Sequence, residues 1–224
     1  MARGGIQPKG GVKIIWSTGF AYAIGLIASD GNLSPDGRHI LFTSKDIELI
    51  ELFKKALNIS SYHVGRKSSG SNKEKKYYVV QFSDVLFYNF LLSIGIGPKK
   101  SLTLGIVDIP SKYFFDFLRG VFDGDGTFYS YWDKRWRSSF MFYSVFVSAS
   151  KRHTDWLRRE IKRRLKIFGH VSVSYTKINP CYQLRYAKKE SLVLLSSIYH
   201  GDGTYLSRKR LKIDRALAKI GLSL

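Results

Sequence analysis

A short pattern that occurs twice is the sequence feature that most constrains the fold. Each copy is an apolar stretch with a glycine in its middle and the pair Asp-Gly at its end, and the copies occupy residues 23–31 and 118–126. Gly25 and Gly120 lack a Cβ, so two helices can approach there until their backbones nearly touch. We therefore predict that both segments are helices that pack side by side.

The residues that follow each copy repeat as well, which indicates two related halves. Hydrophobic periodicity and turn residues predict helices at 46–57, 85–94, 152–168 and 190–199, and strands at 38–44, 62–67, 76–82, 127–135, 140–148, 171–177 and 182–187. Each half reads α-β-β-α-β-β-α, so the predicted fold class is α+β. We place the first half at 1–100, an extended linker at 101–112, the second half at 113–204 and a basic C-terminal helix at 205–224.

The composition points to a polyanionic partner. Lys and Arg number 37 against 17 Asp and Glu, and the net charge is +20. Such an excess is typical of nucleic-acid-binding proteins. No apolar run approaches the roughly 18 residues that span a membrane, and the N-terminus lacks the apolar core of a secretory signal. The single Cys181 excludes an internal disulfide framework and a cysteine-rich zinc site.

Each motif ends in a carboxylate, Asp30 or Asp125, at the C-terminal end of its predicted helix. Free carbonyl oxygens and the negative end of the helix dipole lie at that end. Carboxylate and carbonyl oxygens together suit a hard cation such as Mg²⁺. Two such helices packed side by side would bring the two aspartates together in a nearly two-fold symmetric site.

On these residues the chain resembles the LAGLIDADG homing endonucleases, in the single-chain form with two motifs. In that family the eighth motif residue binds the catalytic metal, and the sixth, here Ala28 and Asp123, does not. The resemblance implies Mg²⁺ or Mn²⁺ as cofactor, with Ca²⁺ binding but not supporting cleavage. The implied metal ligands are Asp30, Asp125 and the backbone carbonyls of Ser29 and Gly124.

The resemblance also implies basic and polar residues just after the second strand of each half, near the cleaved phosphates. Ser44-Lys45 and Ser150-Lys151 fill these places, and Lys45 and Lys151 are predicted to be catalytic. A lysine there can stabilise the pentacovalent phosphate. Lys45 follows its motif aspartate by 15 positions and Lys151 by 26, so the second hairpin is predicted to be longer.

The implied activity is metal-dependent hydrolysis of both strands of double-stranded DNA, without a covalent enzyme intermediate. The two sheets would form a saddle over the major groove. We expect a monomer that cuts a long, asymmetric target and leaves 3′ overhangs. Because the sequence lacks an intein's terminal residues, we also expect a free-standing, intron-encoded protein that is not secreted. Prokaryotic cytoplasm and organelle matrix both stay open.

Strand alternation predicts which residues face DNA, because alternate side chains share one face of a strand. In the second half these are Tyr129, Tyr131, Asp133, Arg135, Ser172, Ser174, Thr176, Gln183 and Arg185, with Ser150 beside the cleaved phosphate. In the first half they are Asn32, Ser34, Asp36, Arg38, His39, Arg66, Lys75, Tyr77 and Gln81, with Ser44 beside the phosphate.

Two other classes of function stay open. The same scaffold could bind nucleic acid without cutting, as an intron RNA maturase or a DNA-binding regulator. The presence of Asp30, Asp125, Lys45 and Lys151 favours the enzyme. A ribosomal or chromatin architectural protein would explain the charge but not the repeated motif.

Overall fold

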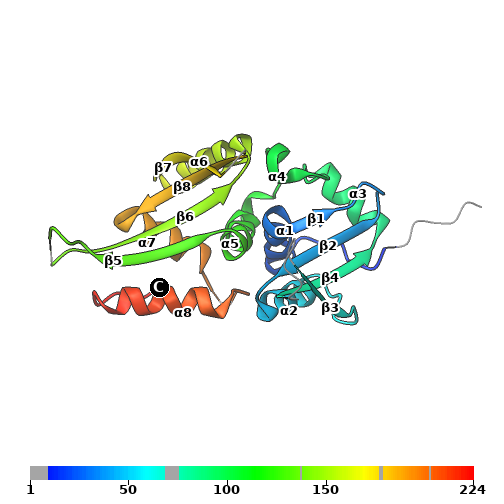
Figure 1. Cartoon of the computed structure of the whole chain (residues 1–224), viewed down its shortest axis with the longest axis horizontal. Coiled ribbons are helices and arrows are strands. Elements are labelled where there is room, and N and C mark those ends of the chain that lie inside the picture. The colour runs from blue at the N-terminus through cyan, green and yellow to red at the C-terminus, as the bar shows by residue number, and fades with distance from the viewer. Residues whose placement is uncertain (1–9, 69–75, 137, 177–178, 202) are drawn as a thin grey trace, which may run out of the picture.

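The computed structural model describes residues 10–68, 76–136, 138–176, 179–201 and 203–224, and they form two halves that meet at a central pair of helices (Figure 1). The first half consists of α1 (Thr18–Asp30), β1 (Gly31–Leu33), β2 (His39–Ser44), α2 (Ile47–Ala56), β3 (Val64–Lys67), β4 (Tyr77–Ser83) and α3 (Val85–Ser93). Its antiparallel sheet has the order β1-β2-β4-β3.

The second half repeats this arrangement. It consists of η1 (Ser111–Tyr113), α5 (Phe114–Gly124), β5 (Thr127–Trp132), β6 (Phe140–Ser148), α6 (Lys151–Leu165), β7 (His170–Thr176), β8 (Asn179–Ala187) and α7 (Lys188–Ile198), and α8 (Ser207–Ala218) follows. The order of its antiparallel sheet is β5-β6-β8-β7, which matches the first sheet strand for strand. The predicted fold class of two pseudo-symmetric α+β halves is therefore confirmed.

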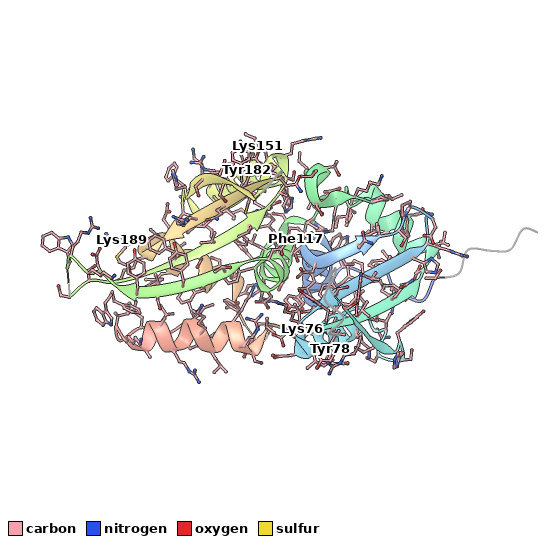
Figure 2. All side chains as sticks on the ribbon, viewed as in Figure 1. Lys76, Tyr78, Phe117, Lys151, Tyr182 and Lys189 are labelled. Carbon is pink, nitrogen blue, oxygen red and sulfur yellow. The ribbon has the colours of Figure 1, made fainter. Side chains whose placement is uncertain are left out.

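The central pair of helices is α1 and α5, and both glycines lie at their crossing. A Cβ added to Gly25 would lie 2.1 Å from the carbonyl oxygen of Phe117, and one added to Gly120 would lie 2.1 Å from that of Tyr22. Only glycine permits backbones to approach this closely. Helix α1 is buried without interruption over nine residues, 20–28, and such a helix belongs to the core. Figure 2 places Phe117 at this centre.

Several predicted boundaries differ from the structure. Strand β1 was not predicted, the strand predicted at 62–67 begins at Val64, and the helix predicted at 152–168 ends at Leu165. Residues 101–112 were expected to be extended, but a short helix, α4 (Lys100–Thr103), includes the first three of them. The first strand of the second hairpin ends at Trp132 rather than at Arg135. The Asp133 carboxylate accepts a hydrogen bond from the backbone N–H of Arg135 (2.9 Å), and this local bond starts the turn.

The connecting segments fasten each half to the other. Between α4 and η1, the carbonyl of Leu104 accepts a hydrogen bond from Ser150, the N-cap of α6 (2.5 Å). At the start of α8, the N–H of Ser207 donates to Glu48 of α2 (3.0 Å). Helix α8 lies along β5 (Figure 1) and buries Ile213 and Leu217. In the part of the chain described above, no helix is long and apolar enough to cross a membrane.

Candidate functional site

The two motif aspartates meet where α1 and α5 end. Asp30 is the last residue of α1 and Asp125 is the C-cap of α5. The Asp30 carboxylate lies against α5, since a Cβ at Gly124 would be 2.8 Å from Asp30 Oδ2 and 2.0 Å from Ser29 Oγ. The predicted convergence of the two helix ends is therefore found, and glycine at position 124 makes room for it.

The electrostatics of the pair disfavour two negative charges. Desolvation, followed by the charge of Asp125, raises the pKa of Asp30 to about 7, while Lys100 and Lys209 oppose the rise. Desolvation also raises the pKa of Asp125, again opposed by both lysines. A pair of facing carboxylates with raised pKa values gains stability from any cation that enters between them.

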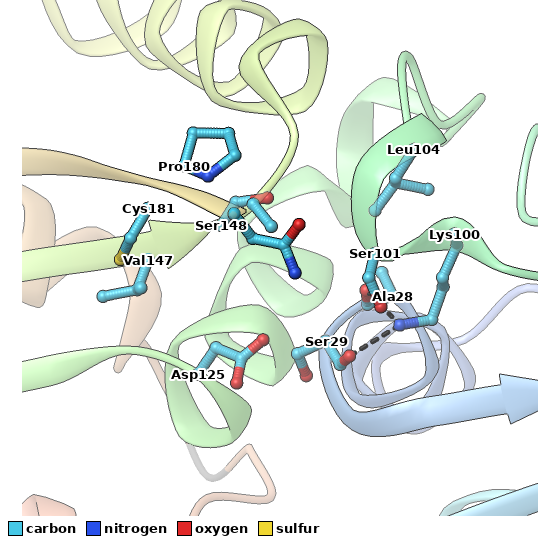
Figure 3. A pocket seen from close by; sticks show the side chains of 12 residues that line it. Ala28, Ser29, Lys100, Ser101, Leu104, Asp125, Val147, Ser148, Pro180 and Cys181 are labelled. Atoms are coloured by element: carbon cyan, nitrogen blue, oxygen red, sulfur yellow. Dashed lines mark hydrogen bonds between the residues drawn. The ribbon is translucent and has the colours of Figure 1, made fainter. Parts of the chain in front are cut away.

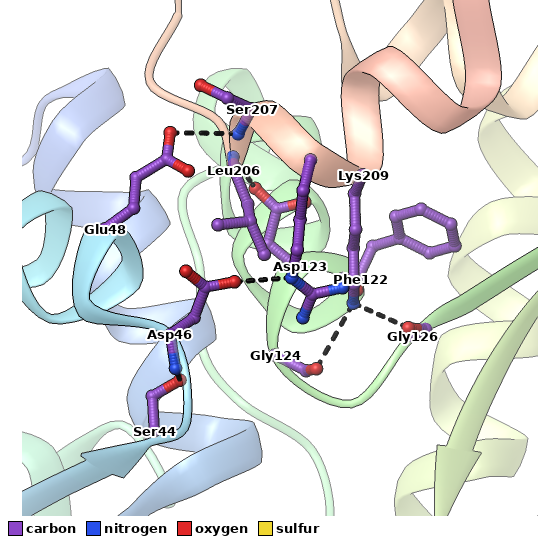
Figure 4. Close-up of polar contacts among 11 residues, drawn as sticks. Ser44, Asp46, Glu48, Phe122, Asp123, Gly124, Gly126, Leu206, Ser207 and Lys209 are labelled. Carbon is purple, nitrogen blue, oxygen red and sulfur yellow. Dashed lines mark hydrogen bonds and ion pairs between the residues drawn. The ribbon is translucent and has the colours of Figure 1, made fainter. Parts of the chain in front are cut away.

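Two buried lysines cap the helix ends, and the sequence reasoning missed both. Lys100 donates to the carbonyls of Ala28 (2.9 Å) and Ser29 (2.6 Å) at the end of α1 (Figure 3). Lys209 donates to the carbonyls of Phe122 (2.5 Å), Gly124 (3.2 Å) and Gly126 (2.6 Å) at the end of α5 (Figure 4). The carbonyls predicted to be metal ligands thus accept lysine hydrogen bonds here.

Both lysines sit in equivalent places. Lys100 follows the last helix of the first half and Lys209 follows the last helix of the second. Burial lowers the pKa of each to about 8, against the attraction of the acidic residues. A signal existed in the sequence, because each is a lysine shortly after an equivalent apolar helix. Their unequal spacing from the motif aspartates concealed it.

A pocket flanks each aspartate. The pocket beside Asp125 has a volume of about 360 Å³ and includes Lys100 and Ser148 in its lining (Figure 3). The pocket beside Asp30 has a volume of about 760 Å³ and includes Lys45 and Ser44. The position of Lys45 agrees with its predicted role, which stays a prediction.

Lys151 does not take the matching position. It is the first residue of α6, its side chain is 67% exposed, and it forms an ion pair with Asp155 (2.7 Å). Figure 2 shows it at the periphery of the second half. The predicted pairing of Lys45 with Lys151 is out of register, because Lys45 precedes the N-cap of α2 and Lys151 follows that of α6. Ser150 is that N-cap and is buried.

Asp123, at the sixth motif position, links three parts of the structure by hydrogen bonds. Its carboxylate accepts hydrogen bonds from Tyr22 (2.9 Å), Tyr199 (3.0 Å) and the N–H of Leu206 (2.7 Å). These bonds join α1, α7 and the start of α8. Asp123 therefore orients the segment that carries Lys209.

No protein-family model and no curated protein matches the sequence, but solved structures match the fold. The meganuclease I-AabMI bound to uncleaved DNA has a TM-score of 0.58 at 13% identity, with 90% of each chain covered. The homing endonuclease I-LtrWI bound to target DNA has a TM-score of 0.57 at 12% identity, with 91% of each chain covered. The chain has the LAGLIDADG fold.

Another similar structure is full-length DUF199/WhiA from Thermatoga maritima, with a TM-score of 0.55 at 16% identity. The match covers 95% of this chain and 64% of that one, so this chain spans less than two thirds of its length. In I-DmoI, solved with DNA and Mn and with DNA and Ca, the match covers 98% and 91% of the respective chains. The structural matches, with TM-scores of 0.55 to 0.58, establish the LAGLIDADG fold for this chain.

In the second half of the LAGLIDADG fold, the strand register places the predicted DNA-facing residues on one face. Tyr129 pairs with Tyr143, Arg185 with Val145, and Gln183 with Val147 and Ser172. This face lies opposite the buried Phe142 and Leu184, which contact the helices. Tyr131 and Ser174 share the face, and Thr176 ends β7. Asp133 and Arg135 form an ion pair in the turn beyond β5 (3.2 Å).

Tyr143 and His170 also belong to this face, and simple alternation could have found both. The Tyr143 ring stacks on that of Tyr129 with centroids 5.1 Å apart, and on that of Tyr131 at 6.2 Å. The three rings form a stacked group on the open face of the sheet.

In the first half, the register agrees with the prediction for most residues. Asn32, His39, Tyr77 and Gln81 lie on the face opposite the buried Phe42, and Ser34, Asp36 and Arg38 lie in or beside the β1–β2 turn. Arg66 pairs with Tyr78 on the helix-covered face, and its guanidinium lies 4.4 Å from the Tyr78 ring centroid. The predicted place of Arg66 on the DNA-facing side of the sheet is therefore wrong. Lys75 lies outside the described residues.

Proposed function

We propose that this chain is a metal-dependent endonuclease that hydrolyses both strands of double-stranded DNA. One observation carries the proposal: Asp30 and Asp125 converge from two pseudo-symmetric helices, between two open-faced sheets. Two antiparallel strands related by a local two-fold axis require two such acidic half-sites. The DNA named for the similar structures I-LtrWI and I-AabMI supports the same partner.

The acidic pair suits a divalent metal, Mg²⁺ or Mn²⁺. Among the described residues, no three His, Cys, Asp or Glu side chains group to hold a metal ion. Mg²⁺ commonly takes only one or two carboxylates and completes its shell with waters and substrate phosphates, so the pair Asp30 and Asp125 fits it. The bound metal would lower the pKa of the attacking water and stabilise the leaving 3′ oxygen.

The chain's own cations complete the electrostatics. Lys100 and Lys209 neutralise the negative helix ends beside the carboxylates, and Lys45 offers a further ammonium group beside Asp30. In the reaction, a water oxygen bonds to phosphorus, the bond to the 3′ oxygen breaks, and a proton passes to that oxygen. The products are a 5′-phosphate and a 3′-hydroxyl. Positive groups around the phosphate stabilise the charge that develops on it.

The open sheet faces supply the reading of sequence. A β-ribbon can enter the major groove and reach base edges, and the net charge of +20 favours phosphate contacts. Because the two faces carry different residues, the target is long and asymmetric. The chain acts as a monomer, since its two halves already provide both half-sites. Cutting across the minor groove leaves 3′ overhangs, and intron homing is the proposed context.

The test is cleavage of a double-stranded DNA library with Mg²⁺, followed by sequencing of the ends. We expect defined breaks with 3′ overhangs, lost in Asp30→Asn and in Asp125→Asn. Asp214→Asn is the matched control, because Asp214 is a surface carboxylate of α8 paired with Arg210. Breaks that persist in both motif variants would contradict the proposed site.

A second function, binding without cleavage, is supported by one observation. The carbonyls of Ser29 and Gly124 are engaged by lysine ammonium groups, so these oxygens are satisfied without a metal. An intron RNA maturase or a DNA-binding regulator needs no metal at these oxygens. Tight, salt-sensitive binding by the wild type with no breaks in the library would favour this second function.

A further inference from the structure

The pockets beside Asp30 and Asp125 are built from equivalent positions. Ser44 ends β2 and accepts a hydrogen bond from the N–H of Asp46, the N-cap of α2 (3.0 Å). Ser148 ends β6 and accepts one from the N–H of Ser150, the N-cap of α6 (3.1 Å). The residue between strand and cap is therefore equivalent in the two halves: Lys45 in one and Ala149 in the other.

The side chains at these equivalent positions differ in chemistry. The register pairs Ser44 with Tyr78 and Ser148 with Tyr182, so the preceding residues of β4 and β8 correspond as well. The pocket beside Asp30 has Thr43, Lys45 and Tyr77, where the pocket beside Asp125 has Val147, Ala149 and Cys181. One pocket offers a hydroxyl, an ammonium and a phenol, and the other offers two aliphatic groups and a thiol.

Two further features, the ammonium of Lys45 and the hydroxyl of Thr43, point to a ligand on the Asp30 side. Lys45 Nζ lies 5.3 Å from the ring centroid of Tyr77, and among the described residues its ammonium forms no ion pair. Thr43 Oγ1 is buried and, within the same set of residues, has no hydrogen-bond partner. A buried hydroxyl of this kind needs a hydrogen-bond partner, such as a water molecule or a phosphate oxygen.

The other charges near the Asp30 pocket cancel. Arg208 reaches into it from α8, but forms an ion pair with Asp46. Lys100 and Lys209 serve the two helix ends equivalently. Between the two equivalent pockets, the uncompensated difference is therefore Lys45, with Thr43 beside it. Lys212 of α8 lines a separate pocket beside Asp125.

We propose that the two half-sites cut at unequal rates, the strand at the Asp30 pocket first, so that a nicked duplex precedes the double-strand break. This inference rests on the proposed nuclease function. Both strands undergo the same hydrolysis, from water and phosphodiester to 5′-phosphate and 3′-hydroxyl. Lys45 stabilises the charge on the phosphorane at one strand, and Ala149 cannot do so at the other.

The experiment uses the target sequence found in the library, with a different dye on each strand, an excess of full-length protein and Mg²⁺. We expect the wild type to cut one strand about tenfold faster than the other. Lys45→Ala and Lys45→Met slow that strand only, which brings the rates together. Ala149→Lys accelerates the other strand. Lys55→Ala, an exposed lysine near the far end of α2, is the control and leaves both rates unchanged.

Equal rates for both strands in the wild type would overturn the inference and leave the nuclease function intact. An equal slowing of both strands by the Lys45 variants would also overturn it, because Lys45 would then act on the site as a whole. Cutting of neither strand by folded wild-type protein, checked by circular dichroism, would contradict the proposed function itself.

Discussion

The two halves share their strand order and their helix crossing, but not their polar chemistry. Both place a glycine at the crossing, an aspartate at the helix end and a lysine on the helix-end carbonyls. They differ at the sixth motif position, which is Ala28 in one half and Asp123 in the other. They also differ in the helix that follows each half, because α4 has 4 residues and α8 has 12.

This comparison separates what the geometry demands from what it allows. The crossing demands glycine in both helices, since either Cβ would meet a backbone carbonyl of the other helix. The pockets beside the carboxylates make no such demand, because their equivalent positions hold Lys45 in one half and Ala149 in the other. Chemical asymmetry between half-sites is therefore compatible with near symmetry of the fold.

The largest expected effect comes from disrupting the helix crossing, the feature that both halves share. Gly25→Ala and Gly120→Ala each place a methyl group 2.1 Å from a carbonyl oxygen. We expect each to lower the free energy of unfolding by about 3 kcal/mol, measured by urea denaturation. Gly19→Ala in the same helix α1 is the control, because its Cβ would lie 3.9 Å from the Cα of Ala56, an ordinary van der Waals contact. A wild-type stability for Gly25→Ala would refute the close crossing.

Substitutions at the sixth motif position test the difference in polar chemistry between the halves. Asp123→Ala leaves Tyr22, Tyr199 and the N–H of Leu206 without their acceptor, and we expect a loss of about 2 kcal/mol. The separate variant Ala28→Asp buries a carboxylate that lacks these donors. We therefore expect this variant, too, to be less stable than the wild type. Denaturation of both variants measures this. If Ala28→Asp is neutral, the first half accommodates the carboxylate and the halves are more alike than the structure indicates.

We expect stability to depend on pH through His153 of α6, a buried histidine of the second half that contacts the linker. Burial lowers its pKa to about 4, against a hydrogen bond with the carbonyl of Gly105 (2.9 Å). Because the unfolded chain binds the proton first, stability is full above about pH 6.5 and falls as the pH drops towards 4. We expect about 2 kcal/mol of this loss between pH 7 and 5. Denaturation of His153→Gln at both pH values should show less loss.

The smallest expected effect is a gain of stability at the site. The folded-state pKa of Asp30, about 7, exceeds its ordinary value of 3.8, so its contribution to stability falls as pH rises between these values. We expect Asp30→Asn to raise the free energy of unfolding at pH 8 by about 1 kcal/mol. Added Ca²⁺ should raise the unfolding temperature of the wild type more than that of the variant. Equal shifts would argue against a cation between Asp30 and Asp125.

The sequence by itself determined the duplicated fold and the two acidic positions. Local patterns carry this information: a strand alternates at every second residue, and a motif helix ends at its Asp-Gly. β6 is predicted to the residue, and the meeting of Asp30 with Asp125 follows from the two glycines. The predicted face of the sheet was wrong for Arg66. Alternation along a strand assigns faces correctly only when the register of that strand is known, and the register of an edge strand was not.

Only the tertiary structure decided which cations serve the site. Lys100 and Lys209 follow their motif aspartates by 70 and 84 positions, and no local pattern connects groups that far apart. Their places depend on how the linker and α8 pack across the halves. The structure also decided that Lys45 corresponds to Ala149 and not to Lys151, because the hydrogen bonds of two helix caps, rather than distance from the motif aspartates, define equivalent positions.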